Sequence, residues 1–149
     1  MTPITSILFA TDFSENSEEA FQYALSFADK FGARLTVLHV INEPVDLRGF
    51  YVPHISFEKL EKEIEEGAEK LMQKFCRSHM RSFTNYETLV VSGIPHEEIV
   101  RRAQEGGYSL IVLGTQGRRG LDHFLFGSTA ESVVRRATCP VVTVRPQQK

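Results

Sequence analysis

The residue pattern most suggestive of chemistry is a set of three glycines followed by two hydroxyl side chains. Gly114 closes an apolar run, and Gly117 follows three residues later. Gly127 stands directly before Ser128 and Thr129, where a helical pattern begins. Glycine permits positive φ angles and a close approach of the backbone to a ligand. Because the N–H groups at the start of a helix are unpaired and attract anions, the pattern predicts a phosphate-binding loop.

Side chains within and after this loop allow more than one interpretation. Ser128, followed three residues later by Glu131, fits a capping box, which on its own would only start a helix. Arg118 and Arg119 could pair with phosphate oxygens, and each could equally be a solvated surface charge. The position of the cap directly after Gly127 favours phosphate binding. Glu131 must then point away from the phosphates or act only through the capping hydrogen bond.

Residues at the ends of two earlier apolar runs could complete such a site. Asp12 follows the run 7–10, where its carboxylate could accept hydrogen bonds from a nucleobase or ribose, or hold a cation. Alternatively, Asp12 or Ser14 caps the next helix. Val40 could pack against an adenine while its backbone reads the base, or it could be only a core valine. His39 beside it is expected to be structural.

The elements that must position these residues alternate between apolar runs and helical periodicity. This order predicts an open α/β fold in which helices cover both faces of a parallel sheet. In such sheets ligands bind beyond the carboxyl ends of the strands, where the strand order reverses. A long irregular loop is expected at 42–55. Strands are expected at 7–10, 35–41, 88–91, 110–113 and 141–144, and helices at 20–31, 57–75, 95–105 and 128–137.

The composition excludes several classes of function. With 149 residues, 42 % hydrophobic and 24 % charged, the chain is expected to be a single domain over residues 1–149. A net charge of −2 gives no electrostatic reason to expect nucleic acid or an anionic membrane as a partner. Cys76 and Cys139 are far apart, which favours a reducing compartment. The residues 1–4 lack signal-peptide features and no apolar run reaches membrane length, so we expect a cytoplasmic protein.

No set of side chains with the spacing of a known catalytic motif accompanies the loop. The chain has neither a GxSxG sequence nor the lysine of a Walker-type GxxxxGK[ST] loop. A receiver domain would carry an aspartate at the end of the third strand, where this chain has Val91, Ser92 and Gly93. We therefore expect a binding protein with, at most, a weak enzymatic activity.

The glycine pattern resembles the ATP-binding motif of the universal stress protein family. That motif has the form Gly-x-x-Gly, nine residues, then Gly-Ser/Thr, and Gly114, Gly117, Gly127 and Ser128 match it with the same spacing. The resemblance extends over essentially the whole chain. The segments similar to the family's first strand, second strand and closing segment are residues 7–12, 38–40 and 137–142.

The resemblance implies a Rossmann-like open parallel five-stranded sheet in the order 3-2-1-4-5, with ATP bound across the ends of the first and fourth strands. It also implies Mg²⁺ or Mn²⁺ as an optional companion of the phosphates. The nucleotide-binding residues would be Ala10, Thr11, Asp12 and Val40 at the adenosine end and Gly114, Thr115, Gly117, Arg118, Arg119, Gly127, Ser128 and Thr129 at the phosphate end. A homodimer would form through the last strand, at Val141, Val142, Thr143 and Val144.

Three hypotheses for the function follow. The leading one is an ATP-binding universal stress protein that acts as a sensor or regulator, with at most slow ATP hydrolysis or autophosphorylation. An adenine-nucleotide α-hydrolase-like enzyme is the first alternative; it would carry a Ser-Gly-Gly-x-Asp-Ser type loop where this chain has the residues 10–14, Ala-Thr-Asp-Phe-Ser. The second alternative is a dimeric interaction module that does not use nucleotide, against which the intact glycine pattern argues.

Overall fold

The fold is a five-stranded parallel sheet in the order β3-β2-β1-β4-β5. The structure is a computed structural model and describes residues 1–42, 57–116 and 126–147. The expected fold class and strand order are confirmed. The strands are β1 (Ser6–Ala10), β2 (Arg34–Asn42), β3 (Tyr86–Gly93), β4 (Leu110–Gly114) and β5 (Val141–Val144), and the helices are α1 (Glu15–Phe31), α3 (Phe57–His79), α4 (Pro95–Glu105) and α5 (Ser128–Arg136).

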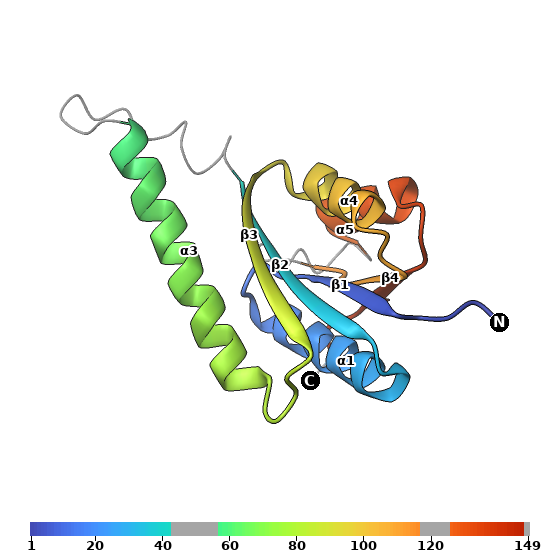
Figure 1. Cartoon of the computed structure of the whole chain (residues 1–149). Coiled ribbons are helices and arrows are strands. Elements are labelled where there is room, and N and C mark those ends of the chain that lie inside the picture. Colours follow the sequence, from blue (N-terminus) through green and yellow to red (C-terminus); the bar gives the residue numbers. More distant parts are fainter. Residues whose placement is uncertain (43–56, 117–125, 148–149) are drawn as a thin grey trace.

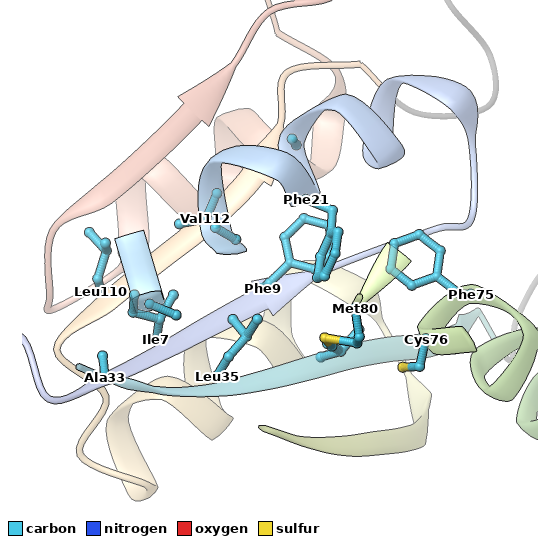
Figure 2. Packing of buried hydrophobic residues seen from close by; sticks show 14 of the residues in the cluster. Ile7, Phe9, Phe21, Ala33, Leu35, Phe75, Cys76, Met80, Leu110 and Val112 are labelled. Atoms are coloured by element: carbon cyan, nitrogen blue, oxygen red, sulfur yellow. The ribbon is translucent and has the colours of Figure 1, made fainter. Parts of the chain in front are cut away.

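Helices cover both faces of the sheet, α1 and α3 on one and α4 and α5 on the other (Figure 1). On the α1 and α3 face, Phe9 lies 5.3 Å from Phe21 and 6.3 Å from Phe75, measured between ring centroids. Figure 2 shows these rings together above β1 and β2. Burying aromatic side chains of this size contributes strongly to stability, so this cluster fixes α1 and the second half of α3 on the sheet.

Local signals in the sequence define both ends of α1. The side chain of Ser14 caps its first turn, because the Ser14 hydroxyl accepts a hydrogen bond from the backbone N–H of Ser17 at 3.2 Å. Gly32 ends the helix in the left-handed conformation, at φ 63°. Of the two residues expected as alternatives for the cap, the structure selects Ser14.

Several elements are longer than the apolar pattern predicts. Helix α1 begins at Glu15 rather than at residue 20, because its first turn is polar and capped. Strand β3 covers Tyr86–Gly93 rather than 88–91, and its first residue already pairs with Leu35 of β2. Strand β3 lies at the edge of the sheet, where one side of the strand is exposed, so its polar residues hide its ends from a search for apolar runs. The loop expected at 42–55 lies outside the described residues from position 43.

Candidate functional site

A cavity of about 1130 Å³ lies at the carboxyl ends of β1, β2 and β4. Its volume is slightly above the range of about 300–1,000 Å³ that is typical of small-molecule sites. Helix α3 closes one side of it, and the first turns of α4 and α5 close another. The expected site residues among its lining are Ala10, Thr11, Asp12, Val40, Gly114, Thr115, Gly127, Ser128 and Thr129. The structure thus brings together every expected site residue that it describes.

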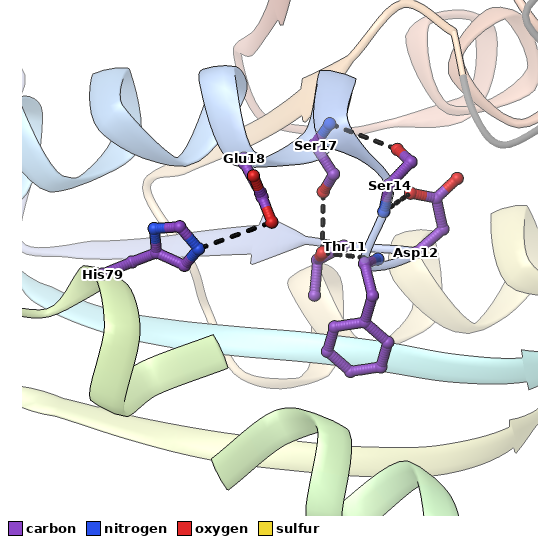
Figure 3. Close-up of polar contacts among 7 residues, drawn as sticks. Thr11, Asp12, Ser14, Ser17, Glu18 and His79 are labelled. Atoms are coloured by element: carbon purple, nitrogen blue, oxygen red, sulfur yellow. Dashed lines mark hydrogen bonds and ion pairs between the residues drawn. The ribbon is translucent and has the colours of Figure 1, made fainter. Parts of the chain in front are cut away.

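The turn after β1 is built around two oxygen atoms (Figure 3). The Thr11 hydroxyl oxygen accepts hydrogen bonds from the backbone N–H of Phe13 at 3.0 Å and from the Ser17 hydroxyl at 2.7 Å. The Asp12 carboxylate accepts one from the backbone N–H of Ser14 at 2.9 Å. Phe13 adopts a positive φ of 64° in this turn. These bonds hold the Asp12 side chain at the edge of the cavity.

The end of β2 offers both an apolar side chain and backbone groups to the cavity. The backbone N–H of Thr11 donates to the carbonyl of Leu38 at 2.9 Å, which is the last backbone-to-backbone bond between the β1 segment and β2 among the described residues. Because backbone groups on a parallel strand alternate in direction, the N–H and C=O of Val40 point to the same side as those of Leu38, beyond the end of β1. Val40 is therefore placed to contact a flat ligand with its side chain and to form hydrogen bonds to it with its backbone.

His39 has the structural setting that was expected for it. Its Nδ1 atom lies 2.8 Å from the backbone oxygen of Thr11, and its ring lies 4.3 Å from that of Phe13 between centroids. These contacts support the turn that carries Asp12.

The two halves of the glycine pattern meet at the opposite edge of the cavity. The backbone N–H of Gly127 donates to the carbonyl of Thr115, and the N–H of Thr115 donates to the carbonyl of Val144 at 3.0 Å. Thr115 is 1 % exposed, and its hydroxyl oxygen has no hydrogen-bond partner among residues 1–42, 57–116 and 126–147. Gly117, Arg118 and Arg119 lie outside the described residues.

The capping box expected at Ser128 is wrong. Helix α5 begins one residue earlier than that interpretation requires, with Gly127 as its N-cap and Ser128 as its first helical residue. Gly127 has no side chain that could cap the helix, and the Glu131 carboxylate instead pairs with Arg135 at 3.0 Å. Within the described residues, the N-cap therefore supplies no side-chain acceptor to the N–H groups at the start of α5, which border the cavity. Such N–H groups attract anions.

Of the two reasons expected for the glycines, positive φ is wrong for Gly114 and Gly127. Gly127 has φ −72° and ψ 167°, and Gly114 is not among the residues with positive φ. A Cβ atom added to Gly114 would lie 2.8 Å from the Nδ2 atom of Asn16. Asn16, in the first turn of α1, donates a hydrogen bond from Nδ2 to the carbonyl of Gln116. Sequence reasoning missed Asn16, since nothing in its spacing links it to a loop 100 residues away.

The two cysteines of the chain give no sign of thiol activation. Burial raises the pKa of the Cys76 thiol, and burial likewise raises that of Cys139, so both favour the unreactive protonated form.

In the part of the chain that the structure describes, no group of three His, Cys, Asp or Glu residues could hold a metal ion. The helices within those same residues include none that is long and apolar enough to cross a membrane.

Two relatives with established family names cover nearly the whole chain. Universal stress protein MJ0577 of Methanocaldococcus jannaschii is 30 % identical over 93 % of this chain and 93 % of that protein. Universal stress protein A homolog 1 of Coxiella burnetii is 35 % identical over 93 % and 94 %, respectively.

Solved structures with the same fold include two nucleotide complexes. The structure of protein MJ0577 matches with a TM-score of 0.85 at 29 % identity and covers 99 % of this chain and all of its own. A universal stress protein in complex with cAMP matches at 0.69 and 22 % identity, covering 96 % and 98 % of the two chains. The universal stress protein of Archaeoglobus fulgidus in complex with dAMP matches at 0.57 and 23 %, covering 95 % and 98 %. At this low sequence identity, the last two matches show a shared fold.

The family model that describes the universal stress protein family matches residues 3–145. With a match of that length and relatives of this similarity, the chain belongs to the universal stress protein family.

Proposed function

We propose that this protein binds an adenine nucleotide, and specifically ATP, in the cavity at the ends of β1, β2 and β4, and that it acts as a cytoplasmic stress-response regulator of one domain. The observation that carries the proposal is the start of α5, where Gly127 leaves the helix without a side-chain cap at the wall of the cavity. Opposite it lie Asp12 and Val40, so one cavity offers an anion-binding end and an end suited to a nucleoside.

The adenosine would occupy the end formed by β1 and β2. Val40 would pack against the base and present its backbone N–H and C=O to the base edge, with Ala10 completing the apolar wall. The Asp12 carboxylate would accept a hydrogen bond from the ribose, with Thr11 fixing the turn that carries it.

The phosphates would occupy the end formed by the glycine loop and α5. The N–H groups of Ser128 and Thr129 would bind their oxygens, and Gly127 would allow them to approach the backbone. The buried hydroxyl of Thr115 would gain a partner there. Gly114, Gly117, Arg118 and Arg119 remain predicted members of the site. The cAMP and dAMP complexes support this assignment, because proteins of the same fold accommodate adenine nucleotides.

The described residues do not fit a resident metal ion, because no group of three metal-binding side chains lies among them. The Asp12 carboxylate already accepts a hydrogen bond from Ser14. A Mg²⁺ or Mn²⁺ ion at this site would therefore enter with the phosphates of the nucleotide, whose oxygens are its preferred ligands.

We expect hydrolysis or autophosphorylation to be slow. Two described carboxylates line the cavity: Asp12 accepts a hydrogen bond from the backbone N–H of Ser14, and Glu131 is paired with Arg135. The turn also argues against an α-hydrolase-like enzyme, since residues 10–14 lack the Ser-Gly-Gly-x-Asp-Ser pattern expected of that group.

We further propose a homodimer that forms through β5. This strand lies at the edge of the sheet, and the side chains of Val141, Val142 and Thr143 are only half-buried. Unpaired backbone groups along such an apolar edge favour pairing with a second copy of the strand.

The proposed site is tested by Gly127→Val together with a thermal-shift series in ATP, ADP and AMP. The φ and ψ angles of Gly127 are open to valine, so the variant should fold, while its branched side chain would fill the position of the phosphates. At 100 times Kd, ATP should stabilise the wild-type protein by about 2.7 kcal/mol, and this shift should vanish in the variant.

Gly127→Ala provides a graded control, because it adds one methyl group and should lose only part of the shift. Mass spectrometry of nucleotide that co-purifies with each variant would identify the natural ligand. A full ATP shift in Gly127→Val would refute the proposed phosphate position.

A further inference from the structure

We propose that Asn16 is a positioning residue that fixes the start of the glycine loop, and that position 114 is a glycine because it makes room for Asn16. The contacts of Asn16 in the protein without ligand support its role at the loop. The expected consequence for ATP affinity rests on the proposed function. The first glycine of the motif would then serve the side chain of α1 and not the phosphates directly.

The contact joins the first turn of α1 to the beginning of the loop. The Nδ2 atom of Asn16 donates to the backbone carbonyl of Gln116, the last described residue before the loop. The preceding residue, Thr115, is already held by Val144 through its N–H and by Gly127 through its carbonyl. Gln116 is thus bonded to α1, and Thr115 is bonded to β5 and to the N-cap of α5. Among these three described bonds, only the one from Asn16 comes from α1.

The missing side chain of Gly114 is what lets the Asn16 amide reach this carbonyl. A Cβ atom at position 114 would lie 2.8 Å from Nδ2 and 3.3 Å from Cγ of Asn16. The Asn16 side chain is short, so it could avoid that Cβ only by giving up its bond to Gln116. Because Gly114 has no positive φ, alanine would cause no backbone strain there, and the cost of the substitution would fall on Asn16.

The amide oxygen of Asn16 lowers the stability of the protein. Its Oδ1 atom is buried and has no hydrogen-bond partner in the described part of the chain. A buried polar atom without a partner costs stability, and a smaller residue in the same place would avoid that cost. The amide cannot be turned over to relieve it, since Oδ1 would then face the Gln116 carbonyl. The Asn16 side chain therefore fits a role in holding the loop in place rather than a contribution to stability.

The test combines Asn16→Ala, Gly114→Ala and the double variant, with Gln22→Ala, an exposed residue of the same helix, as the control. In the protein without ligand, amide hydrogen exchange at Thr115 and Gly127 should quicken in Asn16→Ala and stay unchanged in Gln22→Ala. Asn16→Asp, which keeps the shape of the side chain and loses the donor, should behave like Asn16→Ala in this measurement.

The affinity for ATP, measured by calorimetry, should fall about tenfold in Asn16→Ala and in Gly114→Ala, as expected for a lost hydrogen bond. The double variant should bind no more weakly than Asn16→Ala, because the two side-chain atoms that the added methyl group would crowd are then absent. Unchanged exchange in Asn16→Ala, or additive losses in the double variant, would each overturn the proposal. If the wild-type protein binds no ATP, the proposed function fails, while the exchange measurement still decides the role of Asn16.

Discussion

At the scale of single residues, Thr11 holds the turn that carries Asp12. Its hydroxyl oxygen accepts hydrogen bonds from the Phe13 N–H and the Ser17 hydroxyl, and Thr11 is only 6 % exposed. Thr11→Val keeps the shape and removes this acceptor, leaving two donors unpaired. We expect a loss of about 1–3 kcal/mol in the free energy of unfolding, measured by urea denaturation. Thr11→Ser keeps the oxygen and is the control; equal stability of the valine variant and the wild type would mean that the hydroxyl does not hold the turn.

The same scale shows which parts of the site the sequence could reveal. The positions of Asp12 and Val40 at the cavity were predictable, because Asp12 follows one apolar run, Val40 lies at the end of another, and parallel strands end at one edge of the sheet. The role of the Thr11 hydroxyl was not, since it depends on the positive φ of Phe13, an unusual conformation for a non-glycine residue. Asn16 was hidden because its partner lies 100 residues away, and only the packing of α1 beside β4 brings them together.

At the scale of elements, the first turn of α5 determines how an anion would be held. Ser128 is the first helical residue, a position at which proline is tolerated, and the extended conformation of Gly127 suits a residue that precedes proline. Ser128→Pro should therefore fold normally, lose one N–H group, and bind ATP about 10- to 100-fold more weakly in calorimetry. Ser128→Ala keeps that N–H and should bind ATP better than the proline variant. If the proline and alanine variants bind ATP equally weakly, the contact is made by the Ser128 hydroxyl group and not by its N–H.

The helices and strands were predicted well where the sequence pattern allowed only one interpretation. The central strands and the amphipathic helices emerge from apolar spacing, and Gly32 marks the end of α1 as expected. The N-cap of α5 was misplaced by one residue, because Gly-Ser-Thr offers two acceptable caps and the choice depends on the bond between Gly127 and Thr115. The ends of β3 were missed because an edge strand carries polar residues.

At the scale of the whole molecule, the proposed dimer can be separated from the fold. Pro140 and Val144 direct their carbonyls to β4, so the alternation of the strand turns the N–H of Thr143 toward the free edge. Thr143→Pro removes that N–H and leaves the β4 pairing intact, which proline allows at a sheet edge. We expect a folded monomer in sedimentation experiments where the wild type is a dimer, and Thr143→Val should remain dimeric. A dimeric proline variant would place the interface elsewhere.

The position of β1 in the middle of the sheet also has a consequence for the order in which the molecule folds. Strand β1 pairs with β2, which follows it closely, and with β4, so that Thr5 contacts Ser109 across a separation of 104 residues. Closing so long a loop costs chain entropy and slows folding, whereas β1 reaches β2 through a much shorter connection that contains only α1. The wall formed by β4, β5 and α5 is also the last part of the fold to be synthesised. During synthesis on the ribosome, a nucleotide could stabilise only a chain that had already emerged as far as Val144, so ligand binding would favour finished molecules over nascent ones.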